Sequence, residues 1–189
     1  METLTDRARR TALEMLDDLP RRRAHVAGVA AAAAAAAKGC GLSREDADAL
    51  VASAWLHDIG YAAVIARTGF HPVDGAAHAQ TAGFPATVVS LIAHHTGALF
   101  EAEERGLAAE LAAFSQPEDS LLDLITYSDL TTSPAGEAVD AVDRIAEILS
   151  RYPEGHPVNR AVTRSAPHLL AAVERFEDRQ HRHGAGGRA

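Results

Sequence analysis

Residues 54–61 read AWLHDIGY, a stretch that combines helical spacing with two potential metal ligands. Its apolar first half belongs to a segment whose spacing predicts a helix, and Gly60 ends that segment. His57 and Asp58 follow at the carboxyl end of the helix. Neighbouring side chains on a helix point about 100° apart, so this pair converges on one ion only if the ion lies at the helix end. By itself, the pair also fits a surface histidine beside a helix-terminal aspartate.

Helical spacing continues on both sides of this stretch, and no strand-like alternation persists. We expect helices over residues 5–16, 21–38, 43–58, 72–80, 85–95, 101–114, 117–130, 137–151 and 159–178. Eight consecutive alanines at residues 30–37 indicate a helix that packs closely in the core. The sequence therefore predicts a single all-α domain, a bundle of about seven to nine helices.

The domain organisation follows from the same spacing. We expect an N-terminal helix in residues 1–20, a core in residues 21–135, C-terminal helices of the same domain in residues 136–178 and a disordered tail in residues 179–189. The C-terminal helices either cover the core or form a homodimer interface, and the sequence leaves both open.

Composition excludes several classes of protein. The chain has 189 residues, of which 47% are hydrophobic, and this suits one globular domain. The only cysteine, Cys40, excludes an intramolecular disulfide and a cysteine-built metal site. A net charge of −8 argues against general nucleic-acid binding. The longest apolar stretch, residues 26–37, is too short and too rich in alanine to span a membrane, and we expect a cytoplasmic protein.

Further polar residues fall on apolar stretches or near predicted helix ends. They are His25, His71, His94, His95 and Asp129. Each of these side chains, if buried without a partner, would cost several kcal/mol. Coordination of a shared metal ion removes that cost for all of them together.

The ordered set His25, His57-Asp58 and Asp129 resembles the HD-domain superfamily of metal-dependent phosphohydrolases, and residues 57–60 match its HDIG signature. Two further elements resemble the dinuclear HD-GYP branch. The HPVDG stretch at residues 71–75 matches an HPxxG element, and His94-His95 matches a histidine pair at the end of an apolar helix. The resemblance covers residues 21–135 and implies an HD-type helical bundle.

The resemblance also implies a ligand set and a reaction. One ion would be held by His25, His57, Asp58 and Asp129, and a second by His71, His94 and His95 with Asp58 bridging. Imidazole and carboxylate ligands suit divalent iron, manganese, cobalt or nickel. The expected activity is hydrolysis of a small anionic phosphorylated substrate, a phosphomonoester or phosphodiester such as that of a nucleotide. Asp58, His78 and Arg67 are the candidate catalytic residues, with Tyr61 and Thr132 as weaker candidates.

Two departures from the family pattern keep other functions open. Tyr61 stands where the phosphohydrolases usually have a lysine, and Thr96-Gly97-Ala98 replaces the GYP element, so a cyclic dinucleotide is not the expected substrate. One alternative is an HD-type di-iron oxygenase that acts on a small phosphonate-like or polyol substrate. Another is a regulatory module without catalysis, although such modules lack the ligands that are present here.

Overall fold

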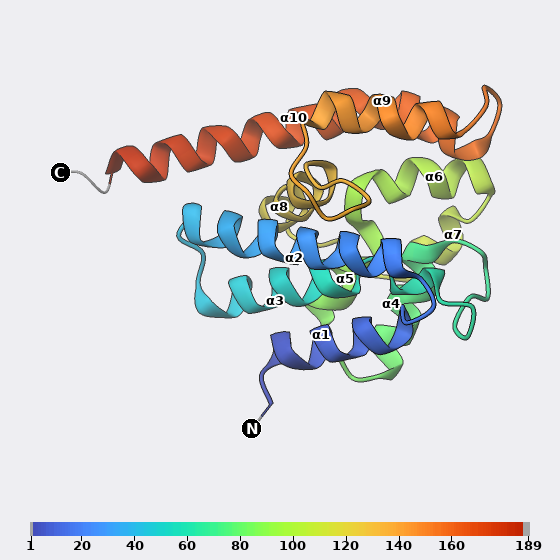
Figure 1. Cartoon of the computed structure of the whole chain (residues 1–189), viewed down its shortest axis with the longest axis horizontal. Helices are drawn as coiled ribbons and strands as arrows, with labels where there is room; N and C mark the ends of the chain where they lie inside the picture. Colours follow the sequence, from blue (N-terminus) through green and yellow to red (C-terminus); the bar gives the residue numbers. More distant parts are fainter. Residues whose placement is uncertain (1, 187–189) are drawn as a thin grey trace.

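The computed structural model describes residues 2–186, and helices dominate this part of the chain (Figure 1). Its α-helices are α1 (Leu4–Met15), α2 (Pro20–Gly39), α3 (Arg44–Leu56), α4 (His71–Thr81), α5 (Ala86–His94), α6 (Ala98–Arg105), α7 (Ala108–Leu111), α8 (Asp119–Leu130), α9 (Ala141–Arg151) and α10 (Pro157–Gly186). Two 3₁₀ helices, η1 (Ile59–Tyr61) and η2 (His95–Gly97), follow α3 and α5. Over residues 2–186, nine α-helices have eight residues or more, which confirms the predicted all-α class.

Helices α2 and α3 lie side by side at the centre of the molecule (Figure 1). The alanine run of α2 presents one face to the core, made of Ala30, Ala33, Ala36 and Ala37. This face shares a core cluster with residues of α3 and α8. Because each alanine side chain is a single methyl group, the neighbouring helices approach α2 closely. The other alanines of the run are exposed or half-buried, so only part of the run is core.

The remaining helices pack around this pair. Helix α1 covers α3, α4 packs on α5, and α8 contacts both α2 and α10. As a result, the end of α3, the start of α4 and the ends of α5 and α8 all meet near His25, in the first third of α2. This meeting point positions the candidate site.

The chain differs from the sequence expectation at residues 101–114, where one helix was expected. Helix α6 ends at Arg105 because Gly106 takes a φ of 70°, a left-handed conformation that does not continue a right-handed helix. The short helix α7 follows in a new direction (Figure 1).

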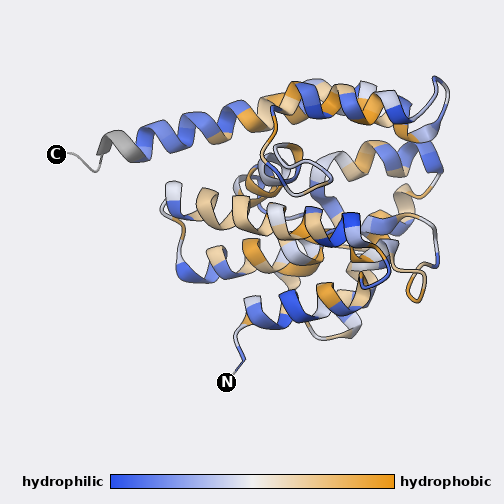
Figure 2. Ribbon diagram, viewed as in Figure 1, coloured by the Kyte–Doolittle hydropathy of each residue, from blue (hydrophilic) through white to orange (hydrophobic). Residues whose placement is uncertain are grey.

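Helix α10 also differs from expectation, because it continues through residues 179–186 of the expected disordered tail. Arg179 anchors the start of this extension by donating to Asp123 at 2.8 Å. The extension reaches past the other helices and is largely hydrophilic (Figure 2). Residues 187–189 of the expected tail lie outside the described residues. No helix in residues 2–186 has both the length and the apolar character that crossing a membrane requires.

Candidate metal centre

Six of the seven predicted metal ligands meet in one buried cluster. They are His25 of α2, His57 and Asp58 at the end of α3, His71 at the start of α4, His95 at the end of α5, and Asp129 of α8. They form three overlapping groups of three, and within each group the potential ligand atoms lie within 4.8 Å of one another. Residues far apart in the sequence are thus brought together by the helix ends.

Backbone carbonyls fix three of the four imidazole rings in one orientation. The contacts are His25 Nδ1 to the Ser133 carbonyl at 3.0 Å, His57 Nδ1 to the Ala54 carbonyl at 2.8 Å, and His95 Nδ1 to the Ile92 carbonyl at 2.7 Å. A carbonyl oxygen only accepts, so Nδ1 carries the hydrogen in each ring. The Nε2 atoms of His57 and His95 can therefore each offer a lone pair to the cluster. In His25, Nε2 instead donates to Asp129 Oδ1 at 3.0 Å, and although burial opposes it, this contact raises the pKa of the ring.

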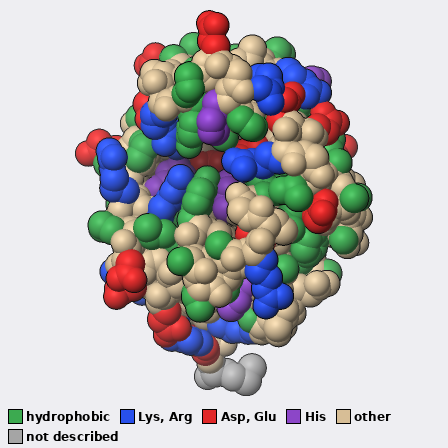
Figure 3. Space-filling view, turned by 90° about the vertical axis from the view of Figure 1, so that its right-hand side faces the viewer, with side chains coloured by type: hydrophobic (Ala, Val, Ile, Leu, Met, Phe, Trp, Pro, Cys, Tyr) green, Lys and Arg blue, Asp and Glu red, His purple; other side chains and the backbone are tan. Residues whose placement is uncertain are grey.

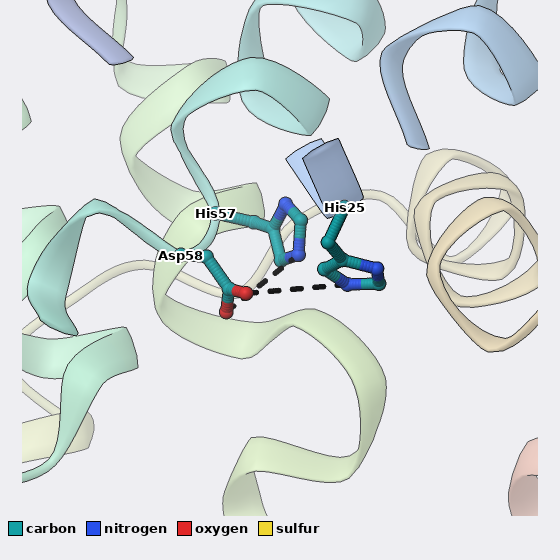
Figure 4. Close-up of side chains that lie close together, drawn as sticks. All are labelled: His25, His57 and Asp58. Atoms are coloured by element: carbon teal, nitrogen blue, oxygen red, sulfur yellow. Dashed lines mark ion pairs between the residues drawn. The ribbon is translucent and has the colours of Figure 1, made fainter. Parts of the chain in front are cut away.

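The Nε2 atom of His57 is buried and has no hydrogen-bond partner among the described residues. It faces Asp58 Oδ1 at 3.7 Å and Asp129 Oδ1 at 3.8 Å, both too far for a hydrogen bond. Figure 4 shows His57 and His25 directed toward the Asp58 carboxylate. An unpartnered buried nitrogen is costly in a protein interior, and a metal ion between it and the carboxylates would remove that cost.

A second close contact also points to a bound metal ion. His71 Nε2 lies 3.2 Å from His95 Nε2 and 3.4 Å from Asp58 Oδ1. Since His95 already donates through Nδ1, its Nε2 offers a lone pair toward His71. Two imidazole nitrogens at this distance need a proton or a cation between them. The donor set of nitrogen and carboxylate oxygen therefore fits a divalent transition metal.

The protonation states of the cluster favour metal binding. Burial opposes ionisation of Asp58, but the neighbouring basic groups, His57 and Arg22 foremost, outweigh it and hold the pKa of that carboxyl well below its usual range. The pKa of Asp129 is also well below its usual range, because the hydrogen bond from His25 outweighs the effect of burial, which opposes ionisation. Burial lowers the pKa of His57 and of His71. Neutral imidazoles and ionised carboxylates are the forms that coordinate metals.

Thr96 positions the Asp129 carboxylate. Its hydroxyl donates to Asp129 Oδ2 at 2.6 Å, while His25 Nε2 contacts Oδ1 of the same carboxylate at 3.0 Å. Thr96 has φ 41° and ψ 54°, a left-handed conformation that β-branched residues rarely adopt. This conformation turns the chain between α5 and α6, so that His95 and Thr96 both face the cluster.

Gly60 allows the start of α4 to reach the end of α3. A Cβ atom at Gly60 would lie 2.0 Å from the backbone oxygen of His71, which leaves no room for any side chain. This close backbone approach brings His71 beside Asp58. Gly60, the glycine of the HDIG stretch, is therefore needed for the close packing that positions His71 in the cluster.

The structure adds Arg22, a residue that the sequence analysis did not single out. Arg22 Nη1 donates to Asp58 Oδ2 at 2.7 Å, and the Arg22 guanidinium lies over the Tyr61 ring. Arg22 precedes His25 by three residues on α2, so both side chains project from one face of the helix. That spacing was a signal available in the sequence. Arg22 supplies a cation beside the position where the family usually has its lysine.

The cluster opens into a cavity of about 360 Å³. On this side of the molecule Figure 3 shows a hollow that holds acidic and histidine side chains, with basic side chains beside it. Besides five of the clustered residues, the charged and polar lining comprises Arg22, Tyr61, Thr96, Glu101, Arg105, Arg144, Arg151, Tyr152 and His156. The apolar lining comprises Leu130, Ile145, Ile148, Val158, Val162 and Leu169. The site thus combines a buried ligand cluster with an arginine-rich cavity.

Three predicted site residues lie elsewhere. His94 points away from the cluster, and its Nε2 contacts the Phe114 carbonyl at 3.2 Å, because adjacent residues at a helix end diverge and His95 takes the inward direction. His78 is two turns, or about 10 Å, along α4 from His71 and does not line this cavity. Arg67 is exposed, and Asp74 holds its loop by accepting from the Arg67 backbone N–H at 3.0 Å.

A family model described as HD domain matches residues 22–152. This match covers well over half of the chain and contains every residue of the cluster. It also extends beyond residue 135 to include α9. Searches of curated proteins and of solved structures returned no match.

Proposed function

Because this chain belongs to the HD domain family, we propose that it is a metal-dependent phosphohydrolase that hydrolyses a small phosphomonoester or phosphodiester. The observation that carries the proposal is the unpartnered Nε2 of His57, buried between the Asp58 and Asp129 carboxylates. A site with this donor set is suited to a divalent metal ion. The arginines of the adjoining cavity favour an anionic substrate.

Six residues would hold the metal: His25, His57, Asp58, His71, His95 and Asp129. Since all three ligand groups overlap, one ion or two adjacent ions fit the same cluster, and divalent iron, manganese, cobalt or nickel suits its ligands. When bound, such an ion supplies Lewis acidity toward phosphoryl oxygens and acidifies a water for attack.

The chain's own residues bind and orient the substrate. The Arg22 guanidinium is held beside the cluster by Asp58 and by the Tyr61 ring. Because the side chain is already ordered, little conformational entropy is lost when a phosphate binds to it. Guanidinium groups match phosphate oxygens in geometry as well as charge. Arg22 would therefore hold the phosphoryl group against the cluster, while Thr96 keeps Asp129 in place.

The experiment that tests the proposal combines metal analysis with activity. Protein purified without oxygen or chelator is analysed for metals and then assayed with p-nitrophenyl phosphate and bis-p-nitrophenyl phosphate, with oxygen consumption followed in parallel. We expect stoichiometric transition metal and metal-dependent release of p-nitrophenol. His57→Ala should lose both, whereas His168→Ala, a histidine outside the cluster, should keep both.

The same experiment separates the alternatives. Turnover of a phosphonate or polyol that consumes oxygen, with no phosphoester hydrolysis, would assign the site to a di-iron oxygenase and overturn the proposal. Absence of bound metal in protein that is folded would favour a regulatory module. Hydrolysis that persists unchanged in His57→Ala would show that the cluster is not the active site.

A further inference from the structure

Two arginines of α9 share a single carboxylate beside the cavity onto which the ligand cluster opens. Arg144 Nη1 and Arg151 Nε bind the two oxygens of Glu147, the latter at 3.0 Å. Glu147 lies between them on the same helix, and the three side chains together carry one excess positive charge. The pairing leaves the arginines incompletely neutralised.

Arg144 is the more unusual of the two because it is buried. Only 7% of the residue is exposed, and its Nε has no hydrogen-bond partner in the described part of the chain. A buried cation with an unused donor is unfavourable unless an anion completes its hydrogen bonds. Glu147 cannot serve fully, because Arg151 engages its other oxygen.

The position of these arginines connects them to the site. Arg144 and Arg151 line the 360 Å³ cavity together with Asp58, His71 and Asp129. They also line a neighbouring cavity of about 200 Å³ with Arg22 and His25. The remaining charged pair of the main cavity, Arg105 with Glu101, is balanced by its own contact at 2.7 Å. Arg22 pairs with Asp58 of the cluster, so the remaining excess positive charge of the main cavity is concentrated on α9.

We propose that Arg144 and Arg151 form a second anion subsite, so that the substrate carries two anionic groups, a phosphoester at the metal cluster and a further phosphate or carboxylate at α9. The inference rests on the proposed function for the first group only. Ile145 and Ile148 of α9 and Leu130 of α8 supply an apolar wall of the same cavity, which suits a carbon skeleton between the two charges. Arg144 then determines which phosphoester the site prefers.

The test uses the full, metal-loaded chain and ligands that are not hydrolysed. Binding of alkylphosphonates is compared by calorimetry with that of ω-carboxyalkylphosphonates of matched length, over a series of chain lengths. We expect at least one length at which the added carboxylate strengthens binding by about tenfold or more, which corresponds to one charge-assisted hydrogen bond. Arg144→Gln should abolish that preference and leave alkylphosphonate binding unchanged.

Two further variants keep the test decisive if Arg144→Gln folds poorly. Glu147→Gln removes a half-exposed competing anion and should increase the preference for the carboxylated ligand. Arg160→Gln, which alters an exposed arginine paired with Glu104, should have no effect. Equal binding of both ligand types at every length, or a preference that survives in Arg144→Gln and does not grow in Glu147→Gln, overturns the subsite. Failure of alkylphosphonates to bind at all would instead contradict the proposed function.

Discussion

Arg22 and Tyr61 are stacked: the guanidinium carbon of Arg22 lies 3.9 Å from the centroid of the Tyr61 ring. The same guanidinium donates to Asp58 at 2.7 Å. A cation over an aromatic face is stabilised by the electrons of the ring, and it is fixed in place when a carboxylate holds its other edge. Tyr61, which stands where the phosphohydrolases usually have a lysine, therefore supports the cation of Arg22, which comes from α2.

Replacing Arg22 should weaken substrate binding. Arg22→Gln removes a charged donor from the phosphate position, and we expect KM for p-nitrophenyl phosphate to rise roughly 10- to 100-fold, the range of a hydrogen bond to a charged group. Steady-state kinetics at saturating metal measure this. Arg23→Gln is the matched control, because Arg23 pairs with Asp17 and lines none of the cavities described above. An unchanged KM in Arg22→Gln would refute the assigned role.

His71 and His94 should differ in their effect on metal content. His71→Ala removes a nitrogen from the cluster and should reduce bound metal, whereas His94→Ala should retain it, since His94 lies outside the cluster and contacts the Phe114 carbonyl. Elemental analysis of both variants beside the wild type measures the difference. If His94→Ala loses metal as His71→Ala does, the placement of His94 outside the cluster is wrong.

Thr96 should affect metal affinity without being a ligand. Thr96→Val removes the hydroxyl that holds Asp129 and should weaken metal binding by about 10- to 100-fold, as loss of a hydrogen bond behind a ligand does. Competition with a coloured chelator measures the affinity. Thr96→Ser keeps the hydroxyl and should bind nearly as well as the wild type. Equal affinities for the valine and serine variants would rule out the hydroxyl's role.

Gly60 should tolerate no side chain. Gly60→Ala places a Cβ against the His71 backbone oxygen, and we expect a loss of about 1–3 kcal/mol in the free energy of unfolding, together with reduced metal content. Urea unfolding measures the first effect. Gly39→Ala is the control, because its Cβ would meet only the end of the flexible Gln180 side chain. Similar losses in both variants would contradict the specific contact with His71.

The pH dependence of stability should include a contribution from His78. Burial lowers its pKa in the folded chain below the unfolded value of about 6.5. The unfolded state therefore binds more protons as pH falls through that value, and folding loses stability. Urea unfolding at about pH 7.5 and about pH 5.5 should show a smaller loss for His78→Gln than for the wild type. Identical losses would show that His78 does not contribute.

Much of the fold was predictable because local signals and packing agree. Helical spacing located the helices, and Ser43 caps α3 as its position before acidic residues indicates. The ordered histidines and aspartates predicted six members of the cluster that the structure brings together. These residues were recognisable because polar side chains on apolar helix faces are rare and their order along the chain is distinctive.

The rest depended on tertiary structure. Which of His94 and His95 faces inward is decided by the turn at Thr96, whose left-handed backbone no sequence pattern predicts for a threonine. Arg144 lies more than a hundred residues from His25, and only the packed fold brings α9 to the cavity. His78 and Arg67 were placed near the site by sequence proximity, but distance along a helix and the loop held by Asp74 separate them from it.

The carbonyl contacts of His25, His57 and His95 have a consequence for metal selection. Because the backbone holds each ring through Nδ1, the rings are preorganised, and little conformational entropy remains to be lost when an ion binds. Such a rigid nitrogen cage adapts poorly to the long, variable oxygen coordination that calcium prefers. We therefore expect the backbone carbonyls that fix these imidazoles to make the site select against large, hard ions such as calcium.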